Sequence, residues 1–274
     1  MPEGDTIHRI AVNLGPRLIG KVLERVTTQG LARQISGVTV TAVTAHGKHL
    51  VIDVDTGSYL RMHLGMYGRQ RSYPRREGEA MLARMSPGRV SLALVTVNDV
   101  HLWIGARTVE ISDRRAPLHG QAISSLGPDV LADDFDSQRA AERAALHKTR
   151  MIADVLLDQR IASGIGNIYK CEALFLRGID PRTRIDAIDV GQLEALYTTA
   201  RELMLENVHP GPGMRSTRER LAGDVPGDER YFVYSRSGKP CRRCQGAISC
   251  YQLGTPPRWT WSCVDCQPQS GVAS

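Results

Sequence analysis

The sequence CRRC at Cys241–Cys244, followed by CVDC at Cys263–Cys266, decides the fold of the carboxyl-terminal part of the chain. These two C-x2-C pairs are separated by 18 residues, 245–262, and this spacing predicts one four-cysteine zinc site. Each pair presents two thiolates from one tight turn, and the intervening segment can form a β-hairpin. Because four thiolates fill a tetrahedral shell, we expect one structural Zn²⁺ and no catalytic metal. The alternative is four unrelated cysteines.

The segment between the cysteine pairs carries RWTW at Arg258–Trp261. An arginine at the tip of a zinc-held hairpin can reach a phosphate group, which indicates contact with nucleic acid. Cys171 falls in a predicted helix and is interpreted as a core residue, whereas the sequence leaves the role of Cys250 open.

The sequence ASGIGN at Ala162–Asn167 forms a glycine-rich turn between two predicted helices. Gly164 and Gly166 allow backbone angles and close approaches that a side chain would block. The following helix begins near Ile168, so its free N–H groups and positive dipole end face whatever lies at the turn. The turn is a candidate anion site, with tight helix packing as the alternative.

The pattern of apolar residues changes near 125–129. Before that point, short Val-rich runs separated by Gly, Asp or Asn predict a β-sandwich or barrel behind an N-terminal helix at 2–12. After it, apolar residues at helical spacing predict four helices. The expected strands are 21–26, 38–45, 49–54, 58–63, 90–97, 100–104 and 108–112. The expected helices are 136–146, 148–160, 168–177 and 190–206, and the Arg-, Pro- and Gly-rich stretch 70–87 is expected to be a long loop.

The chain has 274 residues, a formal net charge of +6 and a sequence pI of about 9.1. Its basic residues cluster in 61–90, with seven arginines, and in 231–264, which holds no acidic residue. Two separate basic stretches are typical of a nucleic-acid footprint, because phosphates provide much of the affinity; two solvated loops are the alternative. Without a signal-peptide pattern or an apolar run of membrane-spanning length, we expect a cytoplasmic, nucleoid-associated protein with no membrane partner.

The amino terminus reads MPEG at Met1–Gly4, and GIGNIY follows at Gly164–Tyr169. Together with an Arg-x-Thr before the second cysteine pair, these motifs resemble the formamidopyrimidine-DNA glycosylase and endonuclease VIII family. The resemblance covers nearly the whole chain, in the family's order. Shorter matches are HLGM at 63–66, LGP at 126–128, EALF at 172–175 and GKP at 238–240.

The resemblance implies an α+β fold, with an N-terminal β-sandwich and a leading helix, then a helix-two-turn-helix domain that ends in the zinc ribbon. The corresponding domains are a catalytic β-sandwich at 1–122, a DNA-binding helical domain at 123–235, and a zinc-ribbon finger with a tail at 236–274. The resemblance also implies that damaged duplex DNA binds in the cleft between the main parts. Because one cleft handles one lesion, we expect a monomer.

The resemblance implies that Pro2 and Glu3 carry out the reaction. Removal of Met1 would leave Pro2 as a terminal secondary amine, and an α-amino group titrates at about pH 8, against about 10.4 for lysine. Such an amine can attack the deoxyribose C1′, displace a damaged base and form a Schiff base that undergoes β,δ-elimination. Glu3 would protonate the sugar ring oxygen. Without the resemblance, Glu3 is typical of an acid in a first helical turn.

Further residues match the family's DNA contacts. Lys48, in a predicted hairpin turn, and Arg258 of the ribbon complete the catalytic set by gripping phosphates beside the lesion. Met66 and Tyr67 would fill the gap left by the extruded base, because base chemistry requires extrusion from the duplex. Two core residues at a strand end are the alternative for this pair. The DNA-binding set comprises Asn167, Gly164, Gly166, Tyr169, Met66, Tyr67 and Arg258.

The motifs divide between two branches of the family. Gly4-Asp5 resembles endonuclease VIII, which acts on oxidised pyrimidines, whereas HLGM at 63–66 resembles the oxidised-purine branch. We expect a bifunctional glycosylase and AP lyase for oxidised pyrimidines such as thymine glycol, with abasic sites as a shared substrate. The alternatives are an oxidised-purine (8-oxoguanine or formamidopyrimidine) glycosylase, a non-cutting damaged-DNA binder on the same scaffold, and a zinc-ribbon transcription or ribosome-associated factor.

Overall fold

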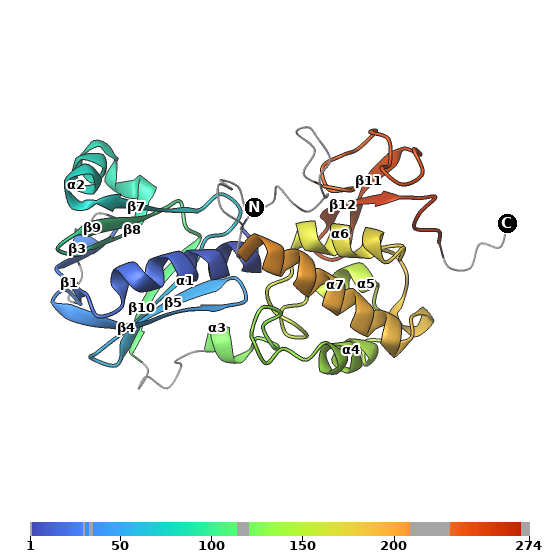
Figure 1. Cartoon of the computed structure of the whole chain (residues 1–274), viewed down its shortest axis with the longest axis horizontal. Helices are drawn as coiled ribbons and strands as arrows, with labels where there is room; N and C mark the ends of the chain where they lie inside the picture. Colours follow the sequence, from blue (N-terminus) through green and yellow to red (C-terminus); the bar gives the residue numbers. More distant parts are fainter. Residues whose placement is uncertain (1, 30, 33–34, 114–120, 209–230, 270–274) are drawn as a thin grey trace. The chain divides into compact units, whose positions relative to one another are not determined.

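The computed structural model describes residues 2–29, 31–32, 35–113, 121–208 and 231–269. The chain divides into two compact units, Met1–Ser125 and Leu126–Ser274, and each is described by itself (Figure 1). The expected three-part division of the chain, with boundaries at 122 and 235, stays a prediction.

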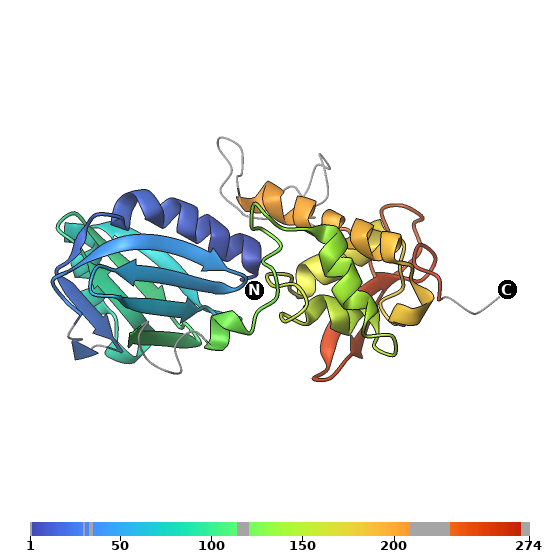
Figure 2. The ribbon, with the colours of Figure 1, turned by 90° about the horizontal axis from the view of Figure 1, so that it is seen from below.

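The N-terminal unit is a β-sandwich of two five-stranded antiparallel sheets, with the long helix α1 (Gly4–Leu18) packed on β4 and β5 of the first (Figure 2). The strand order is β1-β4-β5-β6-β10 in the first sheet and β3-β2-β8-β9-β7 in the second. The sandwich with its leading helix is therefore confirmed. Its elements are β1 (Val22–Leu23), β2 (Arg25–Thr28), β3 (Leu31–Ala32), β4 (Val38–His46), β5 (His49–Val54), β6 (Ser58–His63), β7 (Arg69–Pro74), β8 (Val90–Val95), β9 (Asp99–Ile104), β10 (Thr108–Asp113) and, at the end of the unit, α3 (Gln121–Ser124).

Apolar side chains from both sheets and from α1 form one core. Ile7, Leu14 and Leu18 lie on one face of α1, because these positions recur at helical spacing. They share a packed cluster with Ile52 of β5 and Trp103 of β9, both fully buried. This apolar stripe continues past the expected helix end at residue 12 and carries α1 on to Leu18.

The expected long loop at 70–87 is wrong. The structure has the edge strand β7 there, followed by the helix α2 (Arg75–Arg84) and the short 3-10 helix η1 (Pro87–Arg89). Helix α2 packs on β7 and β9, and a β-carbon added at Gly78 would come 2.4 Å from Cβ of Val100. The glycine therefore lets the helix approach the sheet and does not mark a turn.

The C-terminal unit is largely helical, and its helices share one apolar core. Helix α7 contacts both α4 and α6, and the buried core around them includes Tyr169 and Tyr197. Helix α5 is shorter than the expected 148–160, because the N–H of Ile152 donates to the carbonyl of Thr183 at 2.9 Å and ties the chain to another segment. The helices are α4 (Ser137–Ala145), α5 (Ile152–Leu157), α6 (Asn167–Leu176), the 3-10 helix η2 (Ile185–Ala187) and α7 (Val190–Val208).

A two-stranded hairpin follows the helices within the same unit. Strands β11 (Ile248–Leu253) and β12 (Arg258–Cys263) pair antiparallel, with Ile248 opposite Cys263. The four helices and this hairpin confirm the expected α+β fold. Within the described ranges, no helix is long and apolar enough to cross a membrane.

Candidate functional site

The four cysteines predicted to bind zinc lie together beside the hairpin. Their Sγ atoms all lie within 4.8 Å of one another, with Cys244 and Cys263 3.4 Å apart and Cys241 and Cys266 3.8 Å apart. Four Zn–S bonds of about 2.3 Å in a tetrahedron place the sulfurs roughly 3.8 Å apart. The cluster therefore fits a four-thiolate metal site, as the spacing in the sequence predicts.

Helix α6 holds the strand that carries Arg258. At the first residue of the helix, Nδ2 of Asn167 donates to the carbonyl of Trp259 at 2.8 Å. One turn further on, the buried Nζ of Lys170 donates to Oγ1 of Thr260 at 2.8 Å. Arg258 itself is exposed, and its guanidinium makes no hydrogen bond or ion pair with any residue that the structure describes. The strand is fixed in this way while the charged group stays available for a ligand.

Helix α6 also anchors the segment that leads into the ribbon. The carboxylate of Glu172 accepts hydrogen bonds from the N–H groups of Phe232, Val233 and Tyr234 at 2.7, 3.0 and 2.8 Å. Burial raises the pKa of Glu172, and these three donors oppose that shift. Neither Glu172 nor Lys170 is among the predicted site residues, although two charged residues within an otherwise apolar helix are a visible signal.

The glycine-rich turn directly precedes α6, as expected. Gly164 has a φ of +108°, which favours glycine, and its N–H donates to Oε1 of Gln159 at 3.0 Å. The amide of the same glutamine donates to the carbonyl of Ile165 at 3.0 Å. Gly166 is the N-cap residue of α6, and both glycines are buried. Gln159, which the sequence analysis did not single out, therefore shapes the turn.

Tyr169 lies in the core of the C-terminal unit and not on its surface. Its side chain is fully buried, and its hydroxyl accepts a hydrogen bond from Nδ2 of Asn207 at 3.1 Å. This burial leaves the side chain of Tyr169 no exposed surface for a contact with DNA, and its place in the DNA-binding set stays a prediction. The residue instead supports α6 from the inner side.

Pro2 and Glu3 lie directly before α1. Pro2 is half-buried, whereas Glu3 is fully buried and its carbonyl accepts the N–H groups of Thr6 and Ile7 at 3.1 and 3.3 Å. The side chain of Glu3 makes no capping hydrogen bond to the helix. Its burial without a capping role disfavours the interpretation of Glu3 as an ordinary first-turn acid.

Lys48 lies in the two-residue turn of the β4–β5 hairpin. His46 and His49 pair across this turn, and Gly47 has a φ of +55°, as the first position of a type II′ turn requires. The next strand places His63 opposite His49, and the two imidazole centroids are 4.9 Å apart. Lys48, the predicted phosphate-binding lysine, is therefore followed by His49, which pairs with His63 on the next strand.

The surroundings of both histidines disfavour the charged form of the imidazole. Burial, followed by electrostatic interactions with His63 and with the charged Arg61, lowers the pKa of His49 to about 3. Burial, followed by Lys48, lowers the pKa of His63. Nη1 of Arg61 donates to Nδ1 of His49 at 2.9 Å, and the N–H of Gly65 donates to Nδ1 of His63 at 3.1 Å. The ring protons therefore reside on Nε2, and each imidazole keeps one donor.

Met66 and Tyr67 lie in the turn that follows β6. Met66 is 53% exposed and Tyr67 is 82% exposed, so the alternative interpretation as core residues is wrong. The turn depends on Gly68, because a β-carbon there would come 2.2 Å from the carbonyl oxygen of Leu64. A pair of large apolar side chains consequently projects from the N-terminal unit.

Part of each basic stretch is structural. In the first, Arg61 pairs with Glu110 at 2.5 Å. In the second, Arg236 is 5% exposed and donates to the carbonyl of Pro240 at 3.0 Å. The exposed basic residues that remain, such as Arg258, can contribute to a footprint on an anionic partner.

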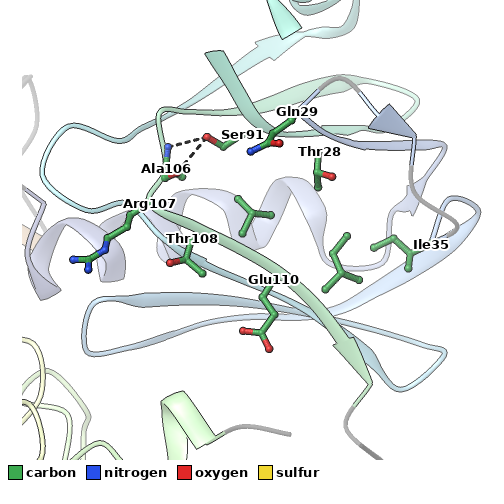
Figure 3. A pocket seen from close by; sticks show the side chains of 10 residues that line it. Thr28, Gln29, Ile35, Ser91, Ala106, Arg107, Thr108 and Glu110 are labelled. Carbon is green, nitrogen blue, oxygen red and sulfur yellow. Dashed lines mark hydrogen bonds between the residues drawn. The ribbon is translucent and has the colours of Figure 1, made fainter. Parts of the chain in front are cut away.

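A cavity of about 1040 Å³ in the N-terminal unit lies between β10 and the β2 and β8 strands (Figure 3). Thr28, Thr108 and Glu110 line it, and the hydroxyl of Ser91 accepts the N–H of Ala106 at 2.9 Å at one end. The predicted catalytic residues do not line this cavity.

Two family profiles match most of the chain. The formamidopyrimidine-DNA glycosylase N-terminal domain matches residues 1–104, and the formamidopyrimidine-DNA glycosylase H2TH domain matches residues 126–219. Endonuclease 8 2 of Mycobacterium tuberculosis is 34% identical over 97% of this chain and 100% of that protein. DNA-(apurinic or apyrimidinic site) lyase Nei2 of Mycolicibacterium smegmatis is 33% identical over 98% of this chain and 100% of that protein.

Solved structures show the same fold. A Lactococcus lactis formamidopyrimidine-DNA glycosylase, bound non-covalently to DNA that contains an AP site, superposes with a TM-score of 0.77 at 21% identity, over 98% of this chain and 100% of that one. The MutM (Fpg) protein of Thermus thermophilus superposes with a TM-score of 0.75 at 26% identity over the same shares. The chain therefore belongs to the formamidopyrimidine-DNA glycosylase and endonuclease VIII family, the DNA glycosylases and AP lyases of base excision repair.

Proposed function

We propose that the chain excises oxidised pyrimidines from duplex DNA and cleaves the strand through the amine of Pro2. The observation that carries this proposal is the position of Pro2, one residue before the fully buried carboxylate of Glu3 and directly before α1. Removal of Met1 would supply the secondary amine. An amine fixed beside a buried acid provides the nucleophile and the proton donor that this route needs.

The reaction begins when the nitrogen of Pro2 donates its electron pair to C1′. The bond from C1′ to the base breaks, and both electrons leave with the base, which takes up a proton. After the nitrogen loses its own proton, the C1′–O4′ bond opens to an iminium ion, and Glu3 gives the proton that O4′ receives. Loss of the C2′ proton then breaks the bond to the 3′-phosphate, and a later loss from C4′ releases the 5′-phosphate.

We assign Lys48, Arg258 and Asn167 to the phosphates beside the lesion. Lys48 and Arg258 supply positive charge, and the exposure of Arg258 supports this role. The amide of Asn167 carries two N–H groups, so one can bind a phosphate while the other holds Trp259. Gly164 and Gly166 shape the turn before this amide, and Met66 with Tyr67 fills the gap left by the extruded base.

We assign one structural Zn²⁺ to the thiolates of Cys241, Cys244, Cys263 and Cys266. When bound, the ion would hold the two cysteine turns together and supply no chemistry to base excision. The four sulfurs would fill its coordination shell, because their separations suit a tetrahedral ion.

The preference for oxidised pyrimidines rests on two observations. Gly4-Asp5 follows Pro2 and Glu3 as in the endonuclease VIII branch, and relatives named endonuclease 8 2 are 34% identical. Relatives named formamidopyrimidine-DNA glycosylase, such as that of Alteromonas mediterranea at 30% identity, favour the oxidised-purine alternative. We further propose that the chain acts as a monomer in the cytoplasm, associated with the nucleoid.

A panel of duplex oligonucleotides tests the substrate class. Each duplex carries one thymine glycol, 5-hydroxycytosine, 8-oxoguanine or abasic site, and the release of base and the strand ends are both measured. We expect the highest kcat/KM for the oxidised pyrimidines, strand scission at the abasic site, and phosphate at both ends of the gap. Faster excision of 8-oxoguanine would favour the purine alternative, and tight binding without any scission would favour the non-cutting binder.

A further inference from the structure

A hollow of about 580 Å³ lies on the outer face of the second sheet, next to the turn that carries Tyr67. Helix α2 covers this face further along, where Leu82 and Met85 pack against the sheet. Beyond the end of α2 the face is left open, and Tyr67, Arg69, Arg71 and Arg89 are among the residues that line the hollow. We call this hollow the β7 groove.

The β7 groove is strongly basic. Its lining contains three arginines and no acidic residue, and all three arginines are exposed. Within the described residues, none of the three forms an ion pair, and the one hydrogen bond of their side chains joins Nη1 of Arg71 to the carbonyl of Gln70 at 3.3 Å. Elsewhere in this unit, Arg61 and Arg75 each pair with a carboxylate. Three uncompensated guanidinium groups around one hollow are suited to an anionic ligand.

The spacing of two of these arginines fits a polyphosphate chain. Arg69 and Arg71 lie two residues apart on the edge strand β7, so their side chains point to the same face. Two residues of an extended strand span about 7 Å, which is close to the separation of successive phosphates along a DNA strand. Arg89, from η1, adds a third charge at the side of the hollow.

We infer that the β7 groove binds the sugar–phosphate backbone of DNA beside the nucleotide whose place Tyr67 fills. This inference rests on the proposed function, because it takes damaged DNA as the ligand and Tyr67 as the wedge. The groove would hold the duplex against the wedge, while the contacts proposed for Lys48, Asn167 and Arg258 hold the lesion. None of the residues assigned to catalysis lines the β7 groove.

The salt dependence of DNA binding tests the inference. The probe is a duplex with one tetrahydrofuran abasic analogue, and the affinity is measured over a range of salt concentrations. Each phosphate contact adds about 0.9 to the slope of log K against log salt, so Arg69→Gln with Arg71→Gln should lower the slope by about 2. The affinity in dilute salt should fall roughly tenfold or more. Arg69→Lys with Arg71→Lys should restore both.

The matched control is Lys21→Gln with Arg76→Gln, which removes two exposed charges of the same unit away from the groove. An equal fall of the slope in the control and groove variants would overturn the inference, as would an unchanged slope in the groove variant. If the double variant does not fold, Arg69→Gln and Arg71→Gln are tested singly, each with an expected fall of about 1. Neutral methylphosphonates can also replace single phosphates along each DNA strand. Replacement at adjacent positions beside the lesion should lower the affinity of the unaltered protein for the DNA.

Borohydride trapping of the unaltered protein, measured in parallel, separates the two proposals. If no adduct forms but the salt dependence of binding is as predicted, the proposed lyase function is overturned and the inference that the β7 groove binds DNA stands. If an adduct forms but the groove and control variants show equal slopes of log K against log salt, only the inference about the β7 groove is overturned.

Discussion

The side-chain amide of Asn167 donates a hydrogen bond of 2.8 Å to the backbone carbonyl of Trp259. This bond joins the first residue of α6 to the ribbon strand, one residue after Arg258. The two residues assigned to phosphate binding in the C-terminal unit therefore share one local framework, which Lys170 reinforces through Thr260. A change at either residue should affect both contacts.

Asn167→Ala removes one phosphate donor and one tie to the ribbon. Hydrogen bonds to charged groups contribute about 1.5–3 kcal/mol, so the Kd for abasic DNA should rise by at least roughly tenfold. The melting temperature should change little, because the lost tie to Trp259 is a single neutral bond worth about 1 kcal/mol. Gln138→Ala, an exposed amide on α4, is the control and should bind normally. Normal affinity in Asn167→Ala would remove the residue from the site.

Tyr67→Ala should slow base excision from duplex DNA by roughly tenfold, because the gap left by the extruded base is no longer filled. The matched control is Val97→Ala, another exposed apolar side chain of the same unit, at 64% exposure. On single-stranded DNA, which has no opposite strand to stack, the effect of Tyr67→Ala should be much smaller. Equal losses on duplex and single-stranded substrates would contradict the wedge.

The zinc assignment predicts one equivalent of Zn²⁺ per chain by elemental analysis. Cys263→Ser should lose the ion and bind DNA more weakly, because the ribbon that carries Arg258 depends on the metal for its stability. Cys250→Ser is the control, since Cys250 lies outside the four-sulfur cluster and should leave the zinc content unchanged. Retention of zinc in Cys263→Ser would exclude this cysteine as a ligand.

The stability of the N-terminal unit should fall in mild acid. Burial lowers the pKa of His101 to about 4, with Asp99 opposing the shift and Arg17 adding to it, and Nδ1 of the ring lies 2.7 Å from Oγ of Ser72. Because this pKa is depressed below the unfolded value of about 6.5, its contribution is full above pH 6.5 and is lost as the pH falls towards 4.

Urea unfolding at pH 7 and pH 4.5 measures this effect. The midpoint of the unaltered protein should fall more between these pH values than that of His101→Gln. His147→Gln, a partly exposed histidine of the other unit, should behave like the unaltered protein. Identical pH dependence in His101→Gln and in the unaltered protein would show that His101 makes no such contribution.

Most strands and helices could be predicted because local signals decide them. Strands β5 (His49–Val54) and β6 (Ser58–His63) have the predicted bounds, since a Val-rich run and a Gly57 turn delimit them. The error at 70–87 has a tertiary cause. The Arg, Pro and Gly content of this stretch predicts a loop, whereas Gly78 lets α2 approach Val100, a contact that no local pattern reveals.

The four-sulfur cluster could be predicted from the sequence, whereas the environment of the other candidate residues could not. The spacing of the cysteines gave the four-sulfur cluster, and the family motifs gave Pro2 and Glu3. The environment of His49 and His63 depends on strand register and burial, which no local sequence pattern reveals. The family motif predicts a DNA contact for Tyr169, but helical periodicity turns its side chain towards the core.

Borohydride trapping on an oligonucleotide with one abasic site shows whether Pro2 is the nucleophile. The protein is first shown by mass spectrometry to lack Met1, and the adduct is then digested and mapped. We predict a covalent adduct on the nitrogen of Pro2 and none in Pro2→Gly carrying a blocked terminus. An adduct on Lys48, or tight binding to the same DNA without any adduct, would contradict the claim that Pro2 is the nucleophile.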